Sequence, residues 1–148
     1  MTIQTTAMTE LVGSVLGSSP IFILGTDKEP FRGGEYIIYA MEVGEEHRRI
    51  CIRIPKVATG PHTSLLLDRE VDLRRRIELA KIHHFQPLIT SDSSVNNPLQ
   101  SPYMMLGWAD GRPLSWSDSS PSQKELRRNV LRSVANASLD MLRVQDTG

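Results

Sequence analysis

Two hydrophobic segments separated by a short charged break predict an antiparallel β-hairpin over residues 33–55. The segments, 33–43 and 50–55, are rich in β-branched and aromatic residues, and the break between them reads Gly-Glu-Glu-His-Arg-Arg. Such segments favour strands, and a polar break that starts with glycine favours a turn. Arg53 lies between two isoleucines in the more apolar segment. Because a buried cation is costly without a carboxylate or a ligand anion beside it, this arginine needs an anionic partner.

A second hydrophobic pattern predicts a helix over residues 64–82. Its apolar residues recur at helical spacing and form one stripe, which consists of Leu66, Leu73, Ile77 and Ala80. Glu70 has the same phase as this stripe. A carboxylate on a buried helix face needs a cation or several donors, and Arg53 is the candidate. In the alternative, Glu70 lies at the edge of the stripe and pairs with Arg74 on the same helix.

The rest of the chain gives weaker signals of the same kind. We expect a short helix at about 10–16, an extended piece at 21–24, a loop at 25–34 and a strand at 88–90, followed by a polar loop at 91–101. The apolar run 102–108 predicts a last strand that turns at Asp110-Gly111. Ser120-Pro121-Ser122-Gln123 has the residues of a helix start, and the apolar stripe of the helix that follows runs to about Leu142.

Composition limits the classes of function. The chain has 148 residues, enough for one domain with a core, and its 17 basic residues balance its 17 acidic ones. No overall charge therefore attracts it to nucleic acid or to an acidic membrane. No apolar run approaches the roughly 20 residues of a membrane span. The single cysteine, Cys51, excludes an internal disulfide and favours a reducing compartment, so we expect a cytoplasmic location and a structural role for this thiol.

Several other motifs have a structural explanation as well as a functional one. The triple arginine 74–76 could grip phosphates, but the acidic residues around it favour a salt-bridged helix face. The adjacent His83 and His84 favour a helix end over a metal site. Gly33 and Gly34 could form a phosphate-covering loop or a mobile turn, because glycine adopts backbone angles closed to other residues.

The order of these elements resembles the N-terminal lobe and linker of the aminoglycoside phosphotransferase and choline-kinase-like family, which shares the protein-kinase-like fold. The likeness covers about 31–142 and rests on Gly33-Gly34 through Tyr39, Ile-Cys-Ile-Arg-Ile-Pro (50–55), Arg69-Glu70-Val71, Tyr103-Met-Met-Leu-Gly-Trp and Asp110-Gly-Arg-Pro-Leu. The Arg-Ile-Pro form resembles fungal members in particular. The resemblance implies an α+β fold with a lead-in at 1–30 and a kinase-like N-lobe at 31–108. In that lobe one helix packs on an antiparallel sheet, and a linker with the first C-lobe-type helix follows at 109–148.

The resemblance also implies a site for ATP. Arg53 would contact the nucleotide phosphates and Glu70 would position it, an arrangement that preorganises charge for phosphoryl transfer. Gly33 and Gly34 would belong to the loop that covers the nucleotide. Backbone groups of Leu106, Gly107 and Trp108 would meet the adenine, with Met104 or Met105 behind it.

The departures from the family pattern concern catalysis. No histidine is followed two residues later by aspartate, and the motif that holds magnesium is missing, so we expect no catalytic residue, no metal ligands and no turnover by this chain alone. We expect a truncated or split kinase whose helix at 122–142 needs a missing C-lobe or a protein partner to cover its apolar stripe. The alternative is a non-catalytic nucleotide- or protein-binding module derived from the same fold. The acceptor substrate is not indicated.

Overall fold

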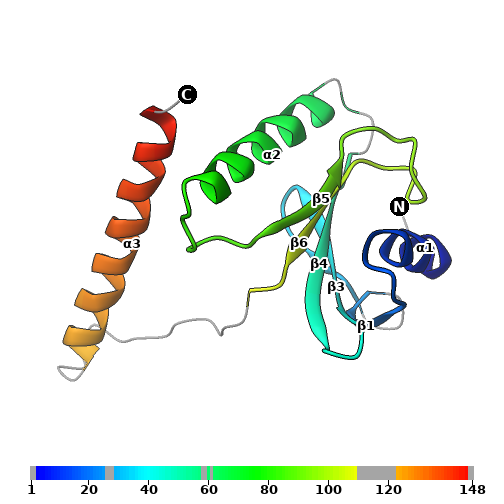
Figure 1. The fold of residues 1–148 in the computed structure, drawn as a ribbon, viewed down its shortest axis with the longest axis horizontal. Coiled ribbons are helices and arrows are strands. Elements are labelled where there is room, and N and C mark those ends of the chain that lie inside the picture. The colour runs from blue at the N-terminus through cyan, green and yellow to red at the C-terminus, as the bar shows by residue number, and fades with distance from the viewer. Residues whose placement is uncertain (1–2, 26–28, 58–59, 61, 110–122, 147–148) are drawn as a thin grey trace. The chain divides into compact units, whose positions relative to one another are not determined.

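The computed structural model describes residues 3–25, 29–57, 60, 62–109 and 123–146. Within these residues the protein has three helices and one six-stranded antiparallel sheet, which confirms a mixed α+β fold (Figure 1). The chain divides into two compact units: a sheet unit of residues 1–75 and 86–108, and a C-terminal unit of residues 76–85 and 109–148. No described helix combines the length and apolarity that a membrane crossing requires.

The predicted hairpin is confirmed. Strands β3 (Tyr36–Val43) and β4 (Arg48–Pro55) pair antiparallel along their full lengths. The turn between them places Gly44 and His47 at positive φ, 78° and 52°. Glycine adopts this backbone conformation without cost, which explains why the charged break starts with it.

The remaining strands extend the sheet on both sides of the hairpin. They are β1 (Pro20–Leu24), β2 (Phe31–Arg32), β5 (Leu88–Asp92) and β6 (Tyr103–Gly107). The strand order is β1-β3-β4-β6-β5, and β2 pairs with β3 beside β1. The segments expected at 21–24, 88–90 and 102–108 are therefore strands, with ends that differ by up to two residues from the prediction. Residues 1–30, expected as a lead-in, contribute α1 and β1 to the sheet unit.

The two faces of the sheet are covered by different helices, α1 and α2 (Figure 1). Ile50, Ile52 and Ile54 face helix α1 (Thr5–Leu16), in a buried cluster that includes Met8, Leu11 and Val12. Cys51, with Met104 and Leu106, faces helix α2 (Thr63–Leu79), whose Leu67 and Val71 complete the second cluster. Since side chains alternate along a strand, Arg53 lies on the α2 face together with Cys51.

Helix α1 begins earlier than the expected start near residue 10. Its first turns bury Met8, which extends the apolar face of Leu11 and Val12 toward the N-terminus. The helix ends at Gly17, whose φ of 73° is left-handed and whose N–H donates to the carbonyl of Gly13 at 2.9 Å. This is the glycine C-cap expected where an apolar stripe stops.

Helix α2 is confirmed, and its predicted stripe is confirmed in part: Ile77 is buried and Leu73 is half-buried. Leu67 and Val71 are buried, whereas Leu66 is 57% exposed and Ala80 is also exposed. Leu66 and Leu67 both fit the helical spacing of an apolar stripe, and packing on the sheet buries Leu67 instead of Leu66. The shift places Glu70 at the edge of the buried face, partly accessible to solvent.

Helix α3 (Lys124–Asp146) confirms the last predicted helix and runs beyond its expected end near residue 142. Of the predicted stripe, Val130, Ala137 and Met141 are half-buried, and Leu126 and Val134 are exposed. The predicted turn at Asp110-Gly111, the segment through Leu114 and the helix start at Ser120–Ser122 lie outside the described residues.

Candidate functional site

An ion pair between strand β4 and helix α2 forms the centre of the candidate site. The Nη1 atom of Arg53 donates to Oε1 of Glu70 at 2.6 Å. The two side chains are 20% and 28% exposed, so water screens the pair only in part. The predicted strand-to-helix pair is therefore present, and a charge-assisted bond of this length is among the stronger hydrogen bonds in proteins.

The alternative partner of Glu70 is present as well. Arg74 donates from Nε at 3.2 Å and from Nη2 at 3.1 Å, and both bonds go to the same oxygen, Oε1. Two guanidinium groups thus share one carboxylate, which leaves this cluster with a net charge of +1 (two positive, one negative). Arg74 is only 17% exposed. A surplus charge with this little exposure is costly, and an anion would offset the cost.

The ring of Tyr36 packs against the guanidinium of Arg53. The Cζ atom of Arg53 lies 4.2 Å from the centroid of the Tyr36 ring, a cation–π distance. Burial, and after it the Glu70 carboxylate, raises the pKa of Tyr36, so its phenol stays protonated at neutral pH. Tyr36 was not predicted as a site residue. The hairpin register pairs it with Pro55, two residues from Arg53, and local sequence periodicity does not give that register.

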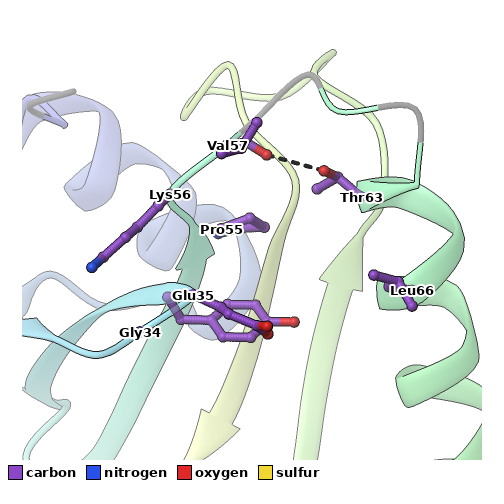
Figure 2. A pocket seen from close by; sticks show the side chains of 8 residues that line it. Gly34, Glu35, Pro55, Lys56, Val57, Thr63 and Leu66 are labelled. Carbon is purple, nitrogen blue, oxygen red and sulfur yellow. Dashed lines mark hydrogen bonds between the residues drawn. The ribbon is translucent and has the colours of Figure 1, made fainter.

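A hollow of about 340 Å³ opens beside Tyr36, between the start of β3, the end of β4 and the first turns of α2 (Figure 2). It is lined by Gly34, Glu35, Tyr36, Pro55, Lys56, Val57, Thr63 and Leu66. The Thr63 hydroxyl donates to the carbonyl of Val57 at 3.1 Å and ties α2 to the chain after β4. The lining is largely apolar, so the hollow suits a ring or an aliphatic group better than a phosphate.

The glycine pair does not use the backbone freedom that we expected of it. Gly33 and Gly34 both have φ outside the left-handed region, and a Cβ added to Gly34 would meet nothing within 4 Å. Gly33 closes a turn by donating its N–H to the carbonyl of Tyr36 at 2.9 Å. Gly25, by contrast, is required by the fold, because its φ is 103° and the Tyr39 ring lies where a Cβ would stand.

The predicted linker residues divide between the two faces of the sheet. Met104 is the register partner of Arg53 and shares its face. Met105 is fully buried in the cluster on the α1 side, so the structure does not bring it together with Arg53. Leu106 is buried in the α2-side cluster, and Trp108 is half-buried against that cluster.

The backbone groups expected to meet adenine already have partners within the chain. The Gly107 N–H donates to the carbonyl of Pro87 at 2.9 Å, and the Trp108 N–H donates to the carbonyl of Arg49 at 3.1 Å. The Gly107 carbonyl accepts from Nε2 of Gln86 at 3.0 Å. A purine edge would have to displace these bonds or add a second bond to a carbonyl.

The described residues contain no group of three or more His, Cys, Asp and Glu side chains placed to hold a metal ion. Of the adjacent histidines, His84 lies 3.1 Å from Asp140, measured between Nε2 and Oδ2, within the C-terminal unit.

Comparison with known proteins adds no relative: no family model, no curated protein and no solved structure matches this chain.

Proposed function

We propose that this chain is the nucleotide-facing, N-terminal part of a small-molecule kinase of the aminoglycoside phosphotransferase-like type, and that Arg53 binds the phosphates of ATP. The whole enzyme would transfer a phosphoryl group to a hydroxyl. These 148 residues contain neither the catalytic aspartate motif nor the magnesium motif, so we expect no turnover from them alone.

The observation that carries the proposal is the ion pair between Arg53 and Glu70. A strand cation held by a helix carboxylate is the arrangement by which kinase folds position a cation for the β- and γ-phosphates. Among the described residues, Glu70 is the only partner to which the Arg53 side chain donates a hydrogen bond, and the donor is Nη1. The remaining N–H donors of Arg53 leave a guanidinium edge for a phosphate oxygen.

The antiparallel sheet with α2 between β4 and β5 supports a kinase-like N-lobe, because that fold also places its carboxylate helix directly after the cation-bearing strand. A phosphate chain fits the surplus charge of the cluster.

Calorimetry with ATP tests the proposal. We expect the full chain to bind ATP, and Arg53→Ala to weaken binding by about 10-fold to 100-fold, the equivalent of one hydrogen bond to a charged group. Arg49→Ala is the matched control, because it removes a cation from the same strand. Arg49 pairs with Glu42, at 3.1 Å between Nε and Oε1, and not with Glu70. Equal ATP affinity in Arg53→Ala and the unmodified chain would contradict the proposal.

The engaged backbone of Gly107 and Trp108 favours a second candidate, a non-catalytic module that binds a polyanion without reading the base. Inorganic tripolyphosphate separates the two. Binding of ATP that is at least about tenfold tighter than that of tripolyphosphate indicates recognition of the nucleoside and supports the kinase-derived site. Equal affinities support the polyanion module.

A further inference from the structure

A continuous series of hydrogen bonds joins the Arg53 cation to the end of strand β6. It starts at Arg53, passes through Oε1 of Glu70 to Arg74, and continues from Nη1 of Arg74 to the carbonyl of Gln86 at 3.3 Å. The Gln86 side chain then donates from Nε2 to the carbonyl of Gly107 at 3.0 Å. All of these residues belong to the sheet unit.

Each member of the series is held by more than one contact. Arg74 donates from three nitrogens, two to Glu70 and one to Gln86. Gln86 bonds through its backbone carbonyl on one side and through its side chain on the other, where Nε2 also lies 3.8 Å from Sγ of Cys51. These residues therefore fix one another, and a shift at one end must be accommodated at the other.

Gly107 packs closely against Pro87, the residue that follows Gln86. A Cβ added to it would stand 2.7 Å from Cγ of Pro87, and the proline ring cannot rotate away. The Gly107 N–H also bonds to the carbonyl of Pro87 at 2.9 Å. The end of β6 is thus locked to Gln86 and Pro87, which gives the hydrogen-bond series a rigid anchor.

We propose that Arg74 and Gln86 are positioning residues for the phosphate-binding cation: Arg74 holds the Glu70 carboxylate in place for Arg53, and Gln86 ties that assembly to the end of β6. This inference rests on the proposed function. Glu70 does not need Arg74 for neutralisation, because Arg53 alone already matches its charge. Arg74 instead restrains the position of Glu70, because its guanidinium bonds to the Glu70 carboxylate and to the Gln86 carbonyl at the same time.

A double-mutant cycle on ATP affinity tests the role of Arg74. We expect Arg74→Gln to weaken ATP binding by about tenfold in the unmodified chain, within the range of couplings through a shared partner. In the Arg53→Ala background the same change should have an effect of less than about twofold, because no cation remains to be positioned. Arg75→Gln removes the same charge from the neighbouring, exposed residue of α2 and should be nearly silent in both backgrounds.

Equal losses from Arg74→Gln in both backgrounds would overturn the inference, because they would mean that Arg74 contacts the ligand itself or acts only through net charge. Gln86→Leu, which removes the bond to Gly107, should also couple to Arg53→Ala, although no hydrogen bond joins Gln86 and Arg53 directly. If Arg74→Gln fails to fold, as judged by circular dichroism, Arg74→Lys replaces it. Lysine keeps the charge but cannot bridge Glu70 and Gln86 with a planar fork.

If the chain binds no ATP, the proposed function is overturned and the positioning role with it, but the connection between Gln86 and Arg53 can still be tested through stability. Urea unfolding of Arg53→Ala, Gln86→Leu and the double variant then measures the connection. If Gln86 is connected to Arg53 through the hydrogen-bond series, the two substitutions should show non-additivity of at least about threefold in the unfolding equilibrium constant. Additive effects in that measurement would overturn the inference that Gln86 is connected to the cation.

Discussion

At the scale of single residues, one carboxylate oxygen controls the candidate site. Oε1 of Glu70 accepts hydrogen bonds from Arg53 and from Arg74, and it is the only anion placed between these two cations among the described residues. Replacing the carboxylate would leave two guanidinium groups facing each other with less than a third of each side chain exposed. The pair of arginines would then repel and remain partly desolvated.

We therefore expect Glu70→Ala to lower the free energy of unfolding by about 2 kcal/mol, less than for a fully buried pair because water reaches these side chains. Added phosphate should restore part of the loss, since an anion bound between the arginines stabilises the folded state. Urea unfolding with and without phosphate measures both effects. Asp68→Ala removes an exposed carboxylate from the same helix and serves as the control. A loss in Glu70→Ala that phosphate does not reduce would argue against an anion site.

At the scale of secondary-structure elements, the connection from β5 to β6 is organised by Asp92. Its carboxylate accepts from the backbone N–H and the hydroxyl of Ser94, at 2.8 and 2.7 Å, and from the Asn97 amide at 3.3 Å. Asn97 in turn donates to the carbonyl of Ser101 at 2.9 Å, just before β6. This loop thus fixes the spacing between the strand that follows Gln86 and the strand that ends at Gly107.

Asp92 should make stability depend on acid. Burial tends to raise the pKa of this carboxyl, but the hydrogen bonds from Ser94 and Asn97 outweigh it and lower the pKa below its ordinary value of 3.8. Because the pKa is lower in the folded state, ionised Asp92 stabilises the fold. This contribution is complete above about pH 3.8 and is lost as the pH falls through the folded-state pKa. We expect Asp92→Ala to lose about 1 kcal/mol at pH 7 and less below pH 3. Urea titrations at the two pH values check this, and an equal loss at both would refute it.

The elements also show how far the sequence could be used for prediction. The pairing of Arg53 with Glu70 was predictable because strand alternation gives the direction of Arg53, and because Glu70 lies at helical spacing from Leu66 and from Leu67 alike. Tyr36 and Gln86 were not, because their contacts depend on the hairpin register and on β6 lying between β4 and β5. Local periodicity also could not separate Leu66 from Leu67, since both fit the helix and only the packing on the sheet selects the buried one.

At the scale of the whole molecule, the residues of the candidate site and both buried clusters of the sheet lie in the sheet unit. The apolar faces of the sheet are covered by helices of the same unit: α1 covers one face and α2 covers the other. A unit that buries its own apolar faces has the main requirement for folding alone. Residues 109–148 contribute no side chain to either cluster in the part of the chain that the structure describes.

We expect a fragment of residues 1–108 to fold without the remainder of the chain. Far-ultraviolet circular dichroism should show mixed helix and sheet, and urea should unfold the fragment in one cooperative transition, because both clusters meet across a single sheet. Its ATP affinity should equal that of the full chain, since Arg53, Glu70, Arg74 and Gln86 are all retained. A fragment that folds but binds ATP more weakly would place part of the site in residues 109–148. A fragment that stays unfolded would show instead that the sheet unit needs those residues for stability, whatever ligand the site takes.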